Sequence, residues 1–178
     1  KTGTLTRNEM FTKTIWTADG AWEFGGEGFG KQGSITRPGA SGRKAFDLLL
    51  IASAVCSDTV LKSKGDQWEI IGNPTEGAVL VAAEKAGMDI DAARKQFEQQ
   101  RLFPFSSETK KMTVYALNKK CGYFAENHVI EFTKGNPASL IAESAYLMKD
   151  GVPALLTESD RAETNRVNNE AAREGYRV

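Results

Sequence analysis

The fold is decided by RLFPFSSETKKMTVYALNKKCGYFAENHVIEFTKG, residues 101–135. Here apolar and polar residues tend to alternate with the period of two that is typical of strands, and polar turns interrupt the pattern. We predict four strands, at 101–106, 110–118, 122–126 and 129–135. Because consecutive strands joined by short turns pair antiparallel, this stretch indicates an antiparallel sheet.

Helical patterns lie on both sides of this stretch. Residues 43–56 are apolar almost all round, as expected of a buried helix. Asn73 and Pro74 form the cap and first turn of a helix, and Asn136 and Pro137 repeat that signal. Further helices are expected at 89–100, 138–147 and 157–174, and further strands at 10–17, 18–24 (after a turn), 67–71 and 176–178. The fold class is therefore α+β, a mainly antiparallel sheet flanked by helices.

The composition excludes several classes of protein. The chain carries 23 Lys and Arg against 23 Asp and Glu, so no net charge draws it to nucleic acid or to an anionic membrane. Cys56 and Cys121 are far apart and read as reduced thiols, and His128 cannot make a metal site alone. The longest apolar stretch, residues 45–56, is shorter than the roughly 20 residues that span a bilayer.

Residues 28–33, GFGKQG, match the dinucleotide-binding pattern G-x-G-x-x-G. That pattern binds phosphate only where a helix opens at its last glycine. SITRPGASG follows instead, and it cannot be helical. We therefore interpret the stretch as a glycine-rich turn, and the sequence has no P-loop either.

Two positions in the strand-rich stretch have a functional and a structural interpretation. Phe105, after a strand, is either a core residue or an aromatic face on which a base stacks. Lys110 begins the next strand and is either solvated or a phosphate ligand.

Three more positions are equally open. Glu76 either caps its helix or holds a carboxylate ready to accept from an exocyclic amine. Lys134 ends a strand, and Gly135 permits close approach of a ligand to the backbone. Arg177, near the last residue, is either exposed or functional.

The order of these pieces carries a resemblance that no single piece does. KTGTLT (1–6), NPTEG (73–77), FPFSS (103–107) with KKM (110–112), KGNP (134–137) and GYRV (175–178) follow one another along the chain. This series resembles the nucleotide-binding domain of P-type ATPases, cation pumps that phosphorylate themselves, and in particular the calcium-pump-like subgroup. The family signature is D-K-T-G-T-L-T, and the chain starts one residue after that Asp. The resemblance implies a hinge strand with the remnant of the phosphorylation motif at 1–12, and a nucleotide-binding domain truncated at its C-terminal end at 13–178.

The resemblance also implies a role for each candidate residue. They are Phe105 (stacking on adenine), Glu76 (near the adenine amino group), Lys134 and Gly135 (lining the base pocket), Lys110 (ribose and phosphates), Arg177 (phosphates on closure) and Thr2 (γ-phosphate and metal in the whole pump). Two departures are visible. KGAPE is replaced by KGNPA, with Asn136 and Ala138, and residues 106–109 read SSET where relatives often carry Arg.

ATP is the implied substrate, and Mg²⁺ is implied for the intact pump but not for this chain alone. The implied partners are the phosphorylation and actuator domains of the same parent chain. The chain would be a monomeric cytoplasmic domain of an integral membrane protein, with no nucleic-acid partner and no catalytic residue, and would bind ATP without hydrolysing it. The alternatives are an interaction module without a nucleotide site, and a phosphatase of the haloacid-dehalogenase type, whose Asp and second acidic motif are absent.

Overall fold

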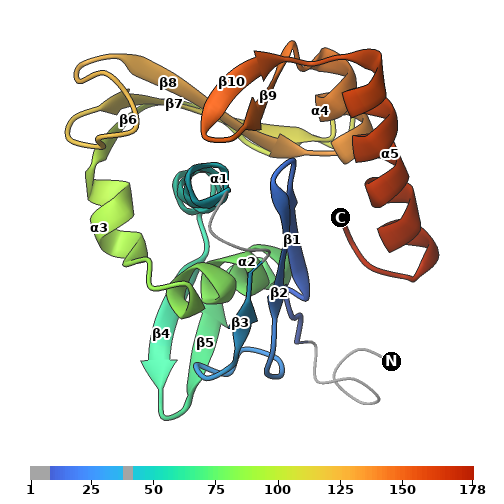
Figure 1. Ribbon diagram of the computed structural model, residues 1–178. Coiled ribbons are helices and arrows are strands. Elements are labelled where there is room, and N and C mark those ends of the chain that lie inside the picture. The colour runs from blue at the N-terminus through green and yellow to red at the C-terminus, as the bar shows by residue number, and fades with distance from the viewer. Residues whose placement is uncertain (1–8, 38–41) are drawn as a thin grey trace.

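The computed structural model describes residues 9–37 and 42–178 (Figure 1). Thr2 and most of the predicted hinge strand at 1–12 lie outside the described residues. The described elements, in chain order, are β1 (Thr14–Thr17), β2 (Gly20–Phe24), β3 (Ile35–Thr36), α1 (Arg43–Val55), β4 (Val60–Lys64), β5 (Gln67–Ile71), α2 (Pro74–Lys85), α3 (Ile90–Lys95), β6 (Phe97–Phe103), β7 (Lys111–Asn118), β8 (Val129–Gly135), α4 (Pro137–Glu143), β9 (Tyr146–Lys149), β10 (Val152–Leu155) and α5 (Glu158–Arg173). The α+β class is confirmed.

The stretch at 101–135 forms most of an antiparallel sheet in the order β6-β7-β8. Along β7, buried residues alternate with partly exposed ones, so that one face of the strand, with Met112 and Val114, meets the core. The strand predicted at 122–126 is wrong. The buried Asn118 amide instead donates to the carbonyls of Cys121, Phe124 and Ala125, which folds this segment into a turn.

Helix α1 lies between that sheet and a lower layer (Figure 1). Phe46 and Leu50 face the lower layer, where Phe46 stacks on Trp22 of β2 at 4.0 Å between ring centroids. Ile51 faces the sheet and joins the cluster around Phe132. The predicted buried helix is confirmed, because apolar residues on both sides find partners.

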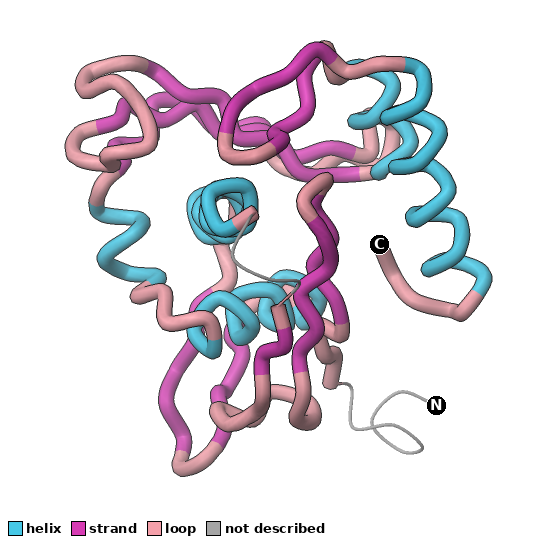
Figure 2. The backbone as a smooth tube through the Cα atoms, viewed as in Figure 1, coloured by secondary structure: helices cyan, strands magenta, loops and turns pink. Residues whose placement is uncertain are grey.

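The lower layer contains α2, the β1-β2-β3 sheet and the β4-β5 hairpin (Figure 2). The predicted cap of α2 is confirmed, since Asn73 Oδ1 accepts from the N–H of Thr75 at 2.9 Å. The glycine-rich turn is also confirmed as structure: a side chain at Gly33 would collide with the carbonyl of Gly25 at 2.1 Å. Strand β4 carries no predicted element, because only its pairing with β5 makes it a strand.

Two predicted helices are too long. The one at 89–100 ends at Lys95, because Phe97 turns into the aromatic cluster with Phe124 and Phe132 and the chain continues as β6. The one at 138–147 ends at Glu143, and its last residues enter β9, which pairs with β10. Tertiary pairing overrides the local helical preference at both places.

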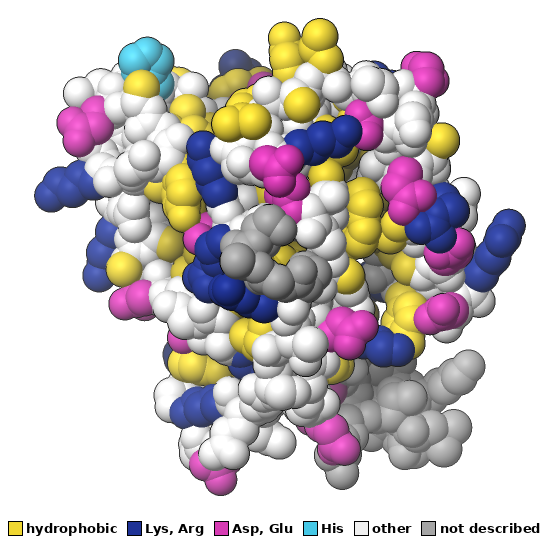
Figure 3. All heavy atoms as spheres, viewed as in Figure 1, with side chains coloured by type: hydrophobic (Ala, Val, Ile, Leu, Met, Phe, Trp, Pro, Cys, Tyr) yellow, Lys and Arg dark blue, Asp and Glu magenta, His cyan; other side chains and the backbone are white. Residues whose placement is uncertain are grey.

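The strand predicted at 176–178 is not formed. The chain turns at the end of α5, where the N–H of Tyr176 donates to Ala171 at 3.0 Å, and the Tyr176 side chain contacts Lys13. Helix α5 is polar: over it, positive and negative side chains alternate at the right of Figure 3, and Arg166 pairs with both Glu163 and Glu170.

Candidate functional site

Two of the candidate residues meet through their side chains. Glu76 lies in the first turn of α2, and Lys134 lies near the end of β8, on the strand face that also carries Phe132. Their carboxylate and ammonium groups form an ion pair through Glu76 Oε1. The Lys134 side chain is 31% exposed and that of Glu76 21% exposed, so solvent reaches the pair from one side.

The second oxygen of Glu76 is held by two hydroxyl groups from the turn after α1. Ser57 Oγ donates to Oε2 at 2.6 Å, and Thr59 Oγ1 donates to the same atom at 3.0 Å. Thr59 Oγ1 also accepts the N–H of Asn73 at 3.0 Å, the backbone donor that Glu76 would take in a capping box. The capping interpretation of Glu76 is therefore wrong, and its carboxylate turns toward Lys134 instead.

These contacts set the charge state of Glu76. Partial burial alone would raise the pKa of this carboxyl, but the hydrogen bonds from Lys134 and Ser57 outweigh it and leave the pKa below its ordinary value. Burial raises the pKa of the neighbouring Cys56 thiol, whose Sγ lies 3.5 Å from the carbonyl oxygen of Met112. The site therefore holds one ionised carboxylate beside one ammonium group and a neutral thiol.

Phe105 follows β6 in the loop that leads to β7. Its side chain is 62% exposed, which rules out the core interpretation. The loop is closed by backbone bonds: Ser106 donates to Lys111 at 3.3 Å, and Lys110 donates to Ser106 at 2.7 Å. An exposed aromatic ring on a closed loop is a stacking surface available to a flat ligand.

Lys110 and Gly135 meet through the backbone. Lys110 has a left-handed conformation (φ 53°), and its carbonyl accepts the N–H of Asn136 at 3.0 Å. A Cβ added at Gly135 would lie 2.3 Å from that same carbonyl. The structure thus gives Gly135 a reason within the chain, close packing against the β7 entrance, and leaves the Lys110 side chain exposed.

Arg177 reaches the residue next to Glu76. Its Nη1 donates to Thr75 Oγ1 at 2.8 Å, which places a guanidinium at the start of α2. The side chain is exposed, and the contact is made across the return of the chain after α5. Arg177 therefore adds positive charge beside the Glu76–Lys134 pair.

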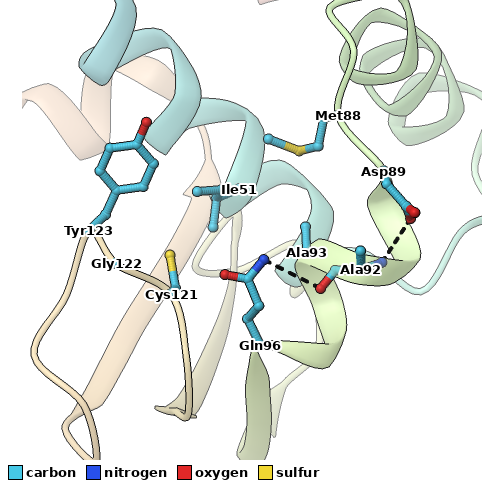
Figure 4. Close-up of a pocket in the computed structure, with 9 residues that line it drawn as sticks. All are labelled: Ile51, Met88, Asp89, Ala92, Ala93, Gln96, Cys121, Gly122 and Tyr123. Carbon is cyan, nitrogen blue, oxygen red and sulfur yellow. Dashed lines mark hydrogen bonds between the residues drawn. The ribbon is translucent and has the colours of Figure 1, made fainter.

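The largest hollow of the described residues lies elsewhere. It has a volume of about 510 Å³ and is lined by residues of α1, α3 and the turn after β7, among them Ile51, Met88 and Tyr123 (Figure 4). None of the six candidate residues at 76–177 lines it, and neither Lys nor Arg is among its lining residues. A hollow without positive charge is poorly suited to a polyphosphate, so the candidate site is the open cluster around Glu76.

Three residues of this cluster escape motif reading. Ser57 and Thr59 hold Glu76, and Arg94 of α3 donates to the carbonyls of that same turn. Hydroxyl residues after a buried helix are a usual feature of loops, so only the fold reveals this role.

The family of the chain follows from comparison with known proteins. Residues 45–178 match the family described as P-type ATPase, cytoplasmic domain N. The chain belongs to this family.

Individual relatives agree. The calcium-transporting ATPase of Bacillus subtilis is 30% identical over 182 residues, which cover all of this chain and 20% of the relative. Human calcium-transporting ATPase type 2C member 1 is 32% identical over 168 residues, 90% of this chain and 17% of the relative. The probable cation-transporting ATPase F of Mycobacterium tuberculosis (strain H37Rv) is 36% identical over 117 residues, 63% of this chain and 13% of the relative. The chain thus spans a fifth or less of these relatives. Among its described helices, none has the length and apolar character needed to cross a bilayer.

Proposed function

We propose that this chain binds ATP at the cluster around Glu76, as the nucleotide-binding domain of a cation pump. The observation that carries the proposal is the Glu76–Lys134 pair, held in place by two hydroxyls and flanked by an exposed aromatic ring. A carboxylate, an ammonium group and a ring complement the amino edge, the nitrogens and the face of adenine.

In this mode the adenine ring stacks on Phe105. Oε2 of Glu76 already accepts from Ser57 and Thr59, whereas Oε1 accepts only from Lys134 among the hydrogen bonds described. Oε1 therefore receives the adenine amino group.

Lys134 and Gly135 line the base pocket, and Lys110 and Arg177 supply positive charge for the ribose and phosphates. One stack and a few polar contacts, less the cost of association, correspond to a dissociation constant of about 0.1–1 mM.

In the parent protein, the domain presents the γ-phosphate to an aspartate of a neighbouring phosphorylation domain, with Mg²⁺ and Thr2 at that step. Residues 1–12 connect to that domain and residues 13–178 bind the nucleotide; the actuator domain is the other partner. The parent is an ATP-driven cation translocase. This chain alone binds ATP without hydrolysing it. Weak binding suits the task, because binding energy is then realised mainly when the domains close.

Titration of the ¹⁵N-labelled chain with ATP, followed by NMR, tests the proposal. We expect shift changes to saturate near millimolar ATP and to cluster at Glu76, Phe105 and Lys134. The rival function is an interaction module without a nucleotide site. A folded sample whose spectrum does not change in several millimolar ATP would support that rival and refute the proposal.

A further inference from the structure

The turn between α1 and β4 is fixed from behind by one side chain. Arg94 projects from α3, donates through Nε to the carbonyl of Ala54 at 2.8 Å, and donates through Nη2 to the carbonyls of Ser57 and Thr59, each at 2.9 Å. The first of these carbonyls belongs to the end of α1, where backbone acceptors have no partner within the helix and a positive charge is favourable.

The same two residues face the candidate site with their side chains. The hydroxyls of Ser57 and Thr59 both donate to Glu76 Oε2, while their carbonyls accept from Arg94. The guanidinium thus acts on the backbone of the turn, and the turn acts on the carboxylate. Arg94 makes no hydrogen bond to Glu76 itself among those described.

Helix α3 gives Arg94 a firm base. Asp89 caps the helix by accepting from the N–H of Ala92 at 2.8 Å, and Ile90 and Ala93 are buried in the core. The turn itself has less support, because a hollow of about 220 Å³ borders both Ser57 and Arg94. Without the guanidinium, the turn has open space beside it into which it can relax.

We propose that Arg94 is a positioning residue for base recognition: it fixes the Ser57–Thr59 turn so that Glu76 presents Oε1 to the amino group of adenine. This inference rests on the proposed ATP binding. It assigns to α3 a part in distinguishing an amino-substituted purine from one that carries a carbonyl at the same position. A carbonyl oxygen facing Oε1 repels it, so the misplaced carboxylate loses discrimination more than overall affinity.

The test compares ATP with inosine triphosphate, which differs at that substituent. Dissociation constants for both are measured by NMR titration for the parent chain, for Arg94→Met and for Arg161→Met. Arg161 is a matched control, because its guanidinium donates to the carbonyls of Ile141, Ala142 and Ser144 after α4, away from the Ser57–Thr59 turn.

We expect the parent and Arg161→Met to prefer ATP by about tenfold, the value of one hydrogen bond to a charged acceptor. Arg94→Met should reduce the preference to about twofold or less by weakening ATP binding, with the affinity for inosine triphosphate unchanged. A general loss of structure would weaken both nucleotides equally.

Full preference in a folded Arg94→Met variant would overturn the inference. If that variant does not fold, Arg94→Lys replaces it: one ammonium group satisfies fewer carbonyls, so an intermediate preference is expected, and parental preference would overturn the inference. A parent that binds both nucleotides equally overturns this inference alone. A parent that binds neither overturns the proposed function as well.

Discussion

At the scale of single residues, Glu76 is the clearest case in which the fold changes an interpretation. From the sequence, a carboxylate three residues after Asn73 is a helix cap. In the structure, Thr59 takes the Asn73 N–H, and Glu76 pairs with Lys134. The decisive residue comes from a different element, so no local pattern around residue 76 reveals it.

Replacement of the exposed ring tests stacking directly. Phe105→Ala should weaken ATP binding about tenfold, because base–aromatic stacking contributes roughly 1–3 kcal/mol. Since Phe105 is 62% exposed, the melting temperature should hardly change. Isothermal titration and a thermal melt measure the two effects.

Phe103→Ala is the control for that variant. Phe103 lies two residues earlier and packs edge-on against Tyr115, with 6.0 Å between ring centroids. It should leave ATP affinity unchanged. Equal affinities for Phe105→Ala and the parent would exclude the stacking role.

The lowered pKa of Glu76 predicts how this residue affects stability in acid. The folded state favours the ionised carboxyl, so the stabilisation is present above the pKa of the unfolded chain and is lost as pH falls through the folded value. Urea unfolding between about pH 6 and pH 3 should therefore show a steeper loss for the parent than for Glu76→Gln, which cannot bind the proton. Parallel curves for the two proteins would contradict the assignment.

At the scale of elements, the sequence indicates those whose signals are local. Asn73-Pro74 and Asn136-Pro137 correctly mark the starts of α2 and α4, and the alternation at 110–118 correctly marks β7. Elements that depend on distant partners are missed. Strand β4 exists because β5 pairs with it, and α3 stops where Phe97 enters an aromatic cluster.

The same division holds for the candidate site. Ordered motifs give Glu76, Phe105 and Lys134 as candidates, and the structure brings Glu76 and Lys134 into contact. The supporting residues Ser57, Thr59 and Arg94 belong to no motif, because their contribution comes from backbone carbonyls and hydroxyls placed by tertiary contacts.

A substitution at the junction of β7 and β8 tests the packing of the sheet. Gly135→Ala should lower the free energy of unfolding by about 1–3 kcal/mol, because the new Cβ would meet the Lys110 carbonyl at 2.3 Å. Urea denaturation gives this difference. Gly122→Ala is the control, since nothing lies within 4 Å of a Cβ there. Similar stabilities for the two variants would show that the Lys110 backbone moves aside at little cost.

At the scale of the whole molecule, the chain is predicted to bind ATP but not to cleave it. The resemblance places the phosphorylated aspartate immediately before Lys1, and we expect no other residue of the chain to replace it. A phosphate-release assay with purified chain and Mg-ATP should give the buffer rate. A rate that scales with chain concentration and persists through successive purification steps would contradict this prediction.

The C-terminal part of the molecule differs from the rest in one respect: α4 and α5, together with β9 and β10, contain no fully buried side chain. Such a region can detach locally at low free-energy cost while the two core clusters around α1 stay intact. Arg177 follows this region, whereas Glu76 and Lys134 belong to elements with buried residues. The guanidinium beside the nucleotide site is therefore a conditional ligand, present only while the C-terminal helices are docked.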